Sequence, residues 1–279
     1  MHLLRYSARI ANDAYWQLLV DEGWAIASHI ALSTLMALFP FLIVLASIAG
    51  FIGSKELADA AAQLMMEAWP EEVAAPIAAE IQSVLTTARG GVLTFGAVFA
   101  VYFSSSGIES LRIGLNRAYG VSEARPLWLL RLESIGYVLV GAGVLLAFGF
   151  LVVLGPFLFG AMTRHLPWLA PFGWIVNFAR YAIASLVLVV TLLVVHLWLP
   201  YGRRRLHQVA PGVIATLILW LVTGDAFGRY LANFAWSYVS TYAGLASAMI
   251  ALVFLYWTAL IFIYGAELNA AIMRGGKPA

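Results

Sequence analysis

Charged and polar side chains within long apolar stretches are the residues of this chain best placed to do chemistry. A charge at mid-bilayer costs about 2.5–3.5 kcal/mol on insertion scales, so such residues mark substrate, ion or proton pathways by default. Serine hydroxyls in the same setting could line a cavity for a lipid headgroup. The candidates for a substrate or ion pathway are Glu109, Asn116, Arg180, Asp225, Glu267 and Asn269, together with Ser104, Ser105 and Ser106.

Most of these candidates also have a structural interpretation. At a rise of 1.5 Å per residue, Glu109 and Glu267 both reach the cytoplasmic end of their apolar stretches. Arg112, Asn116 and Arg117 follow Glu109 within two helical turns, so an ion-pair cluster that seals this end is the alternative to a substrate or proton role. The three serines could likewise bond back to carbonyls of their own helix and serve packing.

Arg180 and Asp225 are predicted to pair across two different stretches. Helical rise places Arg180 about 10 Å, and Asp225 about 6 Å, below the external membrane boundary. Arg229 could compete as an i,i+4 partner of Asp225, but it is expected to lie nearer the headgroups. The depths therefore predict an Arg180–Asp225 salt bridge, either structural or gating an external cavity.

Long apolar helices must position these residues. Of 279 residues, 63% are hydrophobic and 11% are charged, whereas about 25% are charged in soluble domains. About 20 apolar residues span the ~30 Å hydrocarbon core. Six stretches meet this length and predict an all-α integral membrane protein with a six-transmembrane-helix bundle: residues 29–52, 91–110, 134–161, 172–199, 209–234 and 243–273. Pro40 and Pro156 are predicted to kink the first and third helices, because proline lacks the N–H.

The distribution of Lys and Arg predicts the orientation. Eleven lie at the two termini and in the second–third and fourth–fifth connections, against four on the opposite side. By the positive-inside rule both termini are expected in the cytoplasm. We expect a cytoplasmic N-terminal interfacial helix (1–28), a transmembrane domain (29–273) with an external insert of amphipathic helices (54–90), and a cytoplasmic tail (274–279).

Several function classes are poorly supported by the composition. A net charge of +2 is too even for nucleic acid as the partner. The chain has no cysteine, and its five histidines show no metal-ligand spacing. No Walker A sequence and no nucleophile elbow occur, so we expect no metal, no cofactor, no ribonuclease activity and no enzyme. The basic loop is expected to touch anionic lipid headgroups through Arg203, Arg204 and Arg205.

Four strings are specific in combination: HIALSTLMALFPFLIVLASIAG (29–50), FSSSGIESLRIGLNRAYGV (103–121), APG (210–212) and YVSTYAGLASAMIALVFLYWTALIFIYGAELNAAI (238–272). Together they resemble the YihY/virulence factor BrkB family of bacterial inner-membrane proteins, formerly mislabelled ribonuclease BN. The resemblance covers essentially the whole chain and implies six helices with both termini inside. It also implies a link to lipid or lipopolysaccharide export, and it carries over no reaction.

The sequence thus favours an inner-membrane transporter, flippase or export-pathway component for a lipid or amphipathic anion. The principal alternative is a structural or assembly protein without its own substrate, followed by a membrane-embedded enzyme. Membrane lipids are the expected partners, together with a second copy of the chain or a protein of an export pathway.

Overall fold

The described part of the chain is helical. The computed structural model describes residues 2–52, 63, 75, 90–242 and 245–275, and these residues contain no strand. The predicted external insert, 54–90, lies outside them except at 63, 75 and 90. The elements are α1 (His2–Val20), α2 (Gly23–Ile52), α5 (Gly90–Ala118), α6 (Leu127–His165), the 3-10 helix η1 (Pro167–Phe172), α7 (Gly173–Trp198), α8 (Leu206–Tyr242) and α9 (Ala246–Met273).

Four of the described helices are long and apolar enough to cross a membrane. They are α6 within Leu127–Val144, α7, α8 within Leu206–Asn233, and α9. A shorter apolar segment, Gly23–Leu38, lies in α2. The predicted class, an all-α membrane protein, is confirmed, while the count of six spans stays a prediction.

Helix α9 forms the centre of the fold. Phe262, Ile263 and Ala266 of α9 are buried in a core to which α2, α5, α7 and α8 also contribute. On another side of α9, Ile10 and Ala14 of α1 pack against Ala271. The amphipathic stripe of the N-terminal helix is therefore buried against the bundle, while its opposite side, including Trp16, is exposed.

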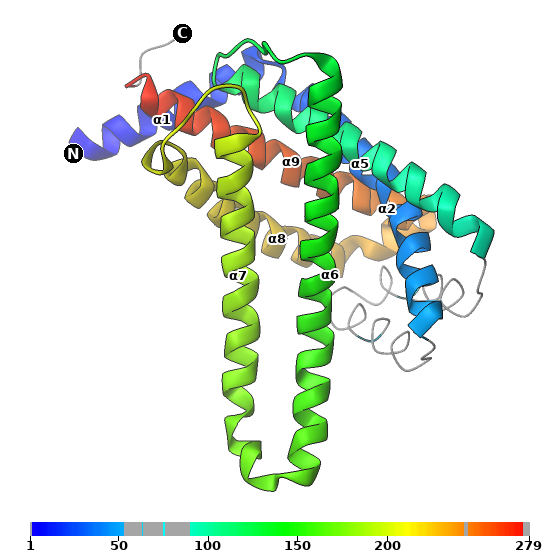
Figure 1. The fold of residues 1–279 in the computed structure, drawn as a ribbon. Coiled ribbons are helices and arrows are strands. Elements are labelled where there is room, and N and C mark those ends of the chain that lie inside the picture. Colours follow the sequence, from blue (N-terminus) through cyan, green and yellow to red (C-terminus); the bar gives the residue numbers. More distant parts are fainter. Residues whose placement is uncertain (1, 53–62, 64–74, 76–89, 243–244, 276–279) are drawn as a thin grey trace.

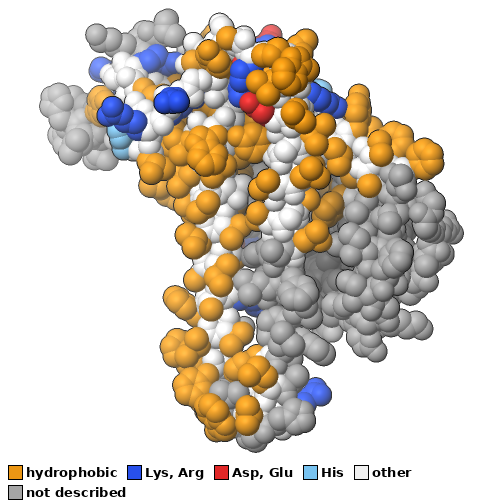
Figure 2. All heavy atoms as spheres, in the orientation of Figure 1, with side chains coloured by type: hydrophobic (Ala, Val, Ile, Leu, Met, Phe, Trp, Pro, Cys, Tyr) orange, Lys and Arg blue, Asp and Glu red, His pale blue; other side chains and the backbone are white. Residues whose placement is uncertain are grey.

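Helices α6 and α7 form a long antiparallel hairpin that crosses the other helices steeply (Figure 1). Its turn, η1, lies far from both chain termini, whereas the α5–α6 and α7–α8 connections lie at the same end as the termini (Figure 1). We call that end the polar end, because basic side chains gather on it (Figure 2). Only 6% of the apolar stretch of α7 is buried. Many apolar side chains lie along the described part of the hairpin (Figure 2), as expected of a surface that faces lipid.

The two prolines predicted to kink helices both fall within helices. Pro40 lies inside α2, and Pro156 lies within α6. The kinks themselves stay a prediction.

Helices α8 and α9 cross at two glycines. A Cβ atom on Gly212 would clash with the Gly265 carbonyl oxygen, and one on Gly265 would lie 2.8 Å from the Gly212 carbonyl oxygen. Asn269 reinforces the crossing, because its Oδ1 accepts a hydrogen bond from the Gly212 N–H at 2.6 Å. Small residues let membrane helices approach this closely, and a buried amide then finds its partner on the other backbone.

The crossing predicts that Gly→Ala destabilises the protein at Gly212 but not at Gly228, both in α8. Gly212→Ala should lower the free energy of unfolding by about 1–3 kcal/mol, because the new methyl group forces the two backbones apart. Gly228→Ala is the matched control, since nothing lies within 4 Å of a Cβ at that position. Thermal unfolding in detergent measures both, and equal midpoints would contradict the glycine crossing.

Candidate functional site

The last turn of α5 organises the polar end. Gly120, with a φ of 62°, lets the chain leave the helix. The N–H groups of Gly120 and Val121 then bond back to the carbonyls of Arg117 and Asn116 at 2.8 and 2.9 Å. The side chain of Asn116 is buried, accepts from the Tyr201 N–H at 2.8 Å and donates to Glu123 at 3.1 Å. One amide thus joins α5 to the α5–α6 and α7–α8 connections.

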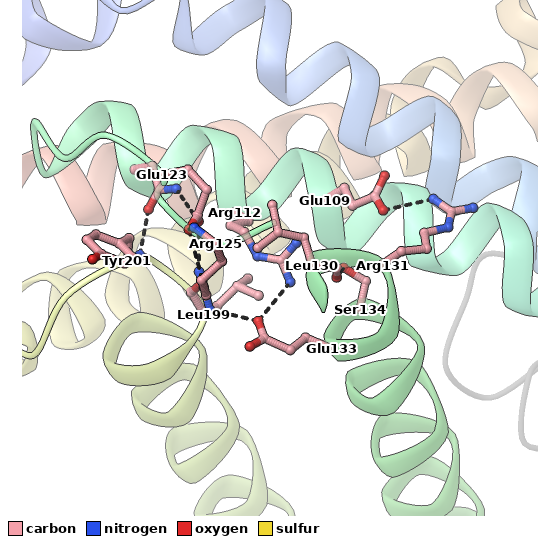
Figure 3. A network of polar contacts seen from close by, with 11 residues as sticks. Glu109, Arg112, Glu123, Arg125, Leu130, Arg131, Glu133, Ser134, Leu199 and Tyr201 are labelled. Carbon is pink, nitrogen blue, oxygen red and sulfur yellow. Dashed lines mark hydrogen bonds and ion pairs between the residues drawn. The ribbon is translucent and has the colours of Figure 1, made fainter. Parts of the chain in front are cut away.

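Arg125 is the hub of the polar network (Figure 3). Its Nε and Nη2 donate to the two oxygens of Glu123 at 2.9 and 2.8 Å, in a bidentate pair. Its Nη1 reaches Glu133 at 2.7 Å, and its Nη2 also reaches the Leu199 carbonyl at 3.1 Å. Hydrogen bonds from Arg125 lower the pKa of Glu123 to about 2. This guanidinium therefore ties the start of α6 to the end of α7.

Glu109 belongs to the same network through α6. Its carboxylate lies 2.9 Å from Arg131, whose guanidinium also stands 4.9 Å from the centre of the Tyr102 ring. Arg112 is 3% exposed and lies 3.6 Å from Glu133. Glu109, Glu123 and Glu133 thus face three arginines, and Figure 3 shows the Glu109–Arg131 pair beside the contacts that join Arg112, Glu133, Arg125 and Glu123. Because the charges balance, the cluster is suited to fixing α5, α6 and α7 rather than to binding a net charge.

Asn269 lies apart from the polar network, at the glycine crossing of α8 and α9. Its Nδ2 donates to the Tyr119 hydroxyl at 3.3 Å. The Arg204 guanidinium lies 3.9 Å from the centre of the Tyr119 ring, and burial raises the pKa of Tyr119 to about 12. Arg204 therefore faces inward, whereas Arg203 and Arg205 are exposed.

The predicted Arg180–Asp225 salt bridge is wrong. Asp225 Oδ2 lies 2.9 Å from the Nε of Arg229, its i,i+4 neighbour on α8. Arg180 instead donates to the Tyr181 hydroxyl at 2.9 Å and lies over the Tyr181 ring. Depth alone was a poor guide, because two residues at the same height can face different ways around their helix axes.

The serine patch bonds to its own helix. Ser105 and Ser106 both donate to the Tyr102 carbonyl, at 2.8 and 3.2 Å, and Ser104 is half-buried. One turn on, Ser110 donates to the Ser106 carbonyl at 3.0 Å and is hydrogen-bonded to His29 of α2.

An apolar cavity of about 140 Å³ lies between α8 and α9 beyond the glycine crossing. Four aromatic residues form half of its wall, and the other lining residues are small or aliphatic: Trp220, Phe227, Phe254 and Trp257, with Thr223, Gly224, Thr258 and Ile261. Trp257 is 46% exposed, so the cavity opens onto the apolar surface. Two of its polar groups are already bonded, since Trp220 Nε1 donates to the Thr258 carbonyl at 3.0 Å and Thr258 donates to Phe254. What remains is an aromatic slot without charge.

Sequence reasoning missed several of these residues. Trp220 and Phe254 looked like ordinary lipid-facing residues, because nothing in the sequence marks two rings on different helices as one wall. Tyr119 stands in the family string LNRAYG and could have been selected from it. Arg125 carried no distinguishing signal, because its partners come from three segments. No group of three or more His, Asp or Glu side chains that could hold a metal ion occurs among the described residues.

A match to a family model covers nearly the whole of this structure. Residues 14–278 match the model for virulence factor BrkB. The chain belongs to the virulence factor BrkB family. The family predicted from the sequence is confirmed, and the polar network, the glycine crossing and the cavity all lie within the matched BrkB region.

Two relatives in other bacteria are similar to the chain over most of its length. A ribonuclease-like protein of Bacillus subtilis (strain 168), YfkH, is 25% identical over 266 residues, covering 92% of this chain and 93% of that protein. A UPF0761 membrane protein of Rhodospirillum centenum (strain ATCC 51521 / SW) is 26% identical over 272 residues, 96% of this chain and 58% of that protein. No solved structure matches the chain.

The hub role of Arg125 predicts a loss of stability when its side chain is replaced. Arg125→Gln should lower the free energy of unfolding near pH 7 by about 1–3 kcal/mol, because Glu123 and Glu133 lose their charged donor. Arg203→Gln, at an exposed position of the same end, should cost little.

Acid unfolding gives the same prediction a second measurement. A carboxyl group whose pKa is lower in the folded protein stabilises the fold at pH values above its ordinary pKa. That stabilisation is lost as the pH falls through the pKa of the folded state. The wild type should therefore lose stability between about pH 4.5 and about pH 2, and Arg125→Gln should lose less over this interval. Parallel acid profiles of the two proteins would contradict the assignment of Arg125 as the hub.

Proposed function

We propose that this membrane protein handles a lipid or another amphipathic anion, as a transporter, flippase or component of an export pathway. The aromatic cavity between α8 and α9 is the observation that carries the proposal. An apolar cavity of about 150 Å³ in another protein stays dry and binds benzene-sized molecules. A cavity of about 140 Å³ can therefore hold part of an acyl chain.

The depth of the cavity fits an acyl chain. At 1.5 Å per residue, Trp220 and Phe227 lie about 16 and 27 Å along α8 from Val209. The midplane of the hydrocarbon core lies about 15 Å from its boundary. With Val209 at the boundary and α8 along the membrane normal, these lengths would place the cavity at the midplane and in the far half of the core, where chains from both leaflets meet.

The polar end supplies the complementary charge. Arg203 and Arg205 are exposed beside the start of α8, and basic side chains gather there (Figure 2). Each Lys or Arg near an anionic membrane surface is worth about 1 kcal/mol of attraction. Anionic headgroups would thus collect at the N-terminal end of α8, and the same helix lines the cavity farther along.

We further propose that the protein lies in the inner membrane with the polar end in the cytoplasm. The excess of Lys and Arg at this end supports the orientation. Cysteine at Ser122, exposed in the α5–α6 connection, should resist an impermeant thiol reagent in intact cells. Cysteine at Arg164, exposed near η1, should react, and no native cysteine interferes. The reverse pattern would overturn the orientation.

A structural or assembly role is the second candidate, and the exposed apolar surface of α7 favours it. Only 6% of its apolar stretch is buried. Helix α7 could therefore pack against a second copy of the chain or an export-pathway protein as readily as against lipid. A catalytic role ranks third, because the BrkB family is not a known enzyme family.

Filling the cavity tests the lipid proposal. A phospholipid with a photoreactive group on its acyl chain should label the peptides that contain Trp220–Phe227 and Phe254–Ile261 after irradiation in proteoliposomes. Gly224→Phe should reduce that labelling severalfold, because the new ring occupies the cavity. Gly228→Phe is the matched control, since Gly228 is not among the wall residues and has open space around it.

Transbilayer movement of a fluorescent lipid, followed in the same vesicles, separates the candidate functions. A lipid-handling protein should accelerate it, and Gly224→Phe but not Gly228→Phe should abolish the acceleration. Labelling spread evenly along α7 and α8, unchanged by Gly224→Phe, would instead indicate annular lipid and favour the structural role.

A further inference from the structure

Glu267 is a fully buried carboxyl group without a donor. Its side chain is 0% exposed in α9. Neither of its carboxylate oxygens has a hydrogen-bond partner among the described residues. An ionised carboxylate in such a place loses its hydration without compensation, which is among the most costly arrangements in a protein interior. Either a cation or a proton must therefore accompany it.

Asp21 lies against Glu267 from the turn between α1 and α2. The two carboxyl groups are within hydrogen-bonding reach, and the charge of Asp21 acts directly on Glu267. Two ionised carboxylates cannot donate to each other, which explains why the Glu267 oxygens have no donor. One added proton turns the same contact into a hydrogen bond, as in pairs of carboxyl groups that share a site.

The other groups around Glu267 do not replace that proton. Arg274, which directly follows α9, acts on it more weakly than Asp21 does, and the Arg274 Nε has no hydrogen-bond partner among the described residues. Tyr119, at the end of α5, also interacts with it electrostatically.

We infer that Glu267 and Asp21 form a proton-binding site that holds one proton between their carboxyl groups. A proton fits better than a metal ion, since no third acid or histidine joins them in the described residues. The site lies toward the polar end of α9, about 1.7 turns beyond Ile261, the nearest residue of the cavity wall. Neither carboxyl group is part of that wall, so the inference does not rest on the lipid proposal.

Proton occupancy controls the packing of the α1–α2 turn on α9. The turn contains Glu22 with a φ of 55°. Arg117 of α5 holds it by donating to the Asp21 carbonyl at 3.2 Å and by bridging to Glu22 at 3.3 Å. Loss of the proton leaves two negative charges in contact at this junction and drives the turn away from α9.

Infrared spectroscopy and thermal unfolding of the full chain in detergent test the site. With glutamate labelled by ¹³C, the wild type near neutral pH should show the carbonyl stretch of a protonated carboxyl group. Glu267→Gln should abolish this band. Glu109→Gln should keep it, because Glu109 is 34% exposed and paired with Arg131.

The pH dependence of stability should follow the proton. The folded state favours the protonated pair, so the wild-type midpoint should fall by several degrees between about pH 6 and about pH 9, the range in which buried carboxyl groups can titrate. Glu267→Gln keeps a donor toward Asp21 without a titrating proton, so its midpoint should stay level. Asp21→Asn should reduce the fall without abolishing it, because Glu267 stays buried and keeps its titrating proton.

Three outcomes would overturn the inference. The first is absence of the protonated band in the folded wild type. The second is a failure of both Glu267→Gln and Asp21→Asn to fold, which would show that both negative charges are needed. The third is stabilisation of the wild type, but not of Glu267→Gln, by added Na⁺, which would assign the site to a metal cation.

Discussion

The close crossing of α8 and α9 at Gly212 and Gly265 is the constraint on which the rest of the structure depends. The two backbones touch there because neither residue has a Cβ atom. Asn269 then binds the Gly212 N–H, so the helices are fixed in register as well as in distance. In a bilayer, where apolar side chains gain little by leaving lipid, backbone proximity and such hydrogen bonds supply the specificity of helix packing.

The crossing divides α9 into regions with different properties. Beyond it, the two helices line the aromatic cavity at Trp220 and Trp257. Toward the C-terminal end of α9, Asn269 donates to the Tyr119 hydroxyl, and the Arg204 guanidinium lies over the Tyr119 ring. On another face, Glu267 meets the turn between α1 and α2. The cavity, the contact to Tyr119 and the buried carboxyl group thus all involve α9, the helix that this crossing fixes against α8.

The length of the hydrophobic runs predicted the all-helical class and the approximate position of the helices along the chain. The reason is that a segment in lipid must form all of its backbone hydrogen bonds within itself. Run length did not give the partners of Glu109 and Asn116, which are Arg131 for the first and Glu123 and Tyr201 for the second. It failed for Arg180 and Asp225, since depth along a helix says nothing about rotation around its axis. Arg125 and the cavity wall were out of reach for a related reason: each is assembled from segments far apart in sequence.

Electron cryomicroscopy of the protein in lipid nanodiscs tests most directly the claim that the α8–α9 crossing holds open an acyl-chain site. The account predicts contact between Gly212 and Gly265 and an elongated density between the rings of Trp220 and Trp257. Helices α8 and α9 packed tightly along their whole length, with the two tryptophan rings in contact and no density between them, would contradict it.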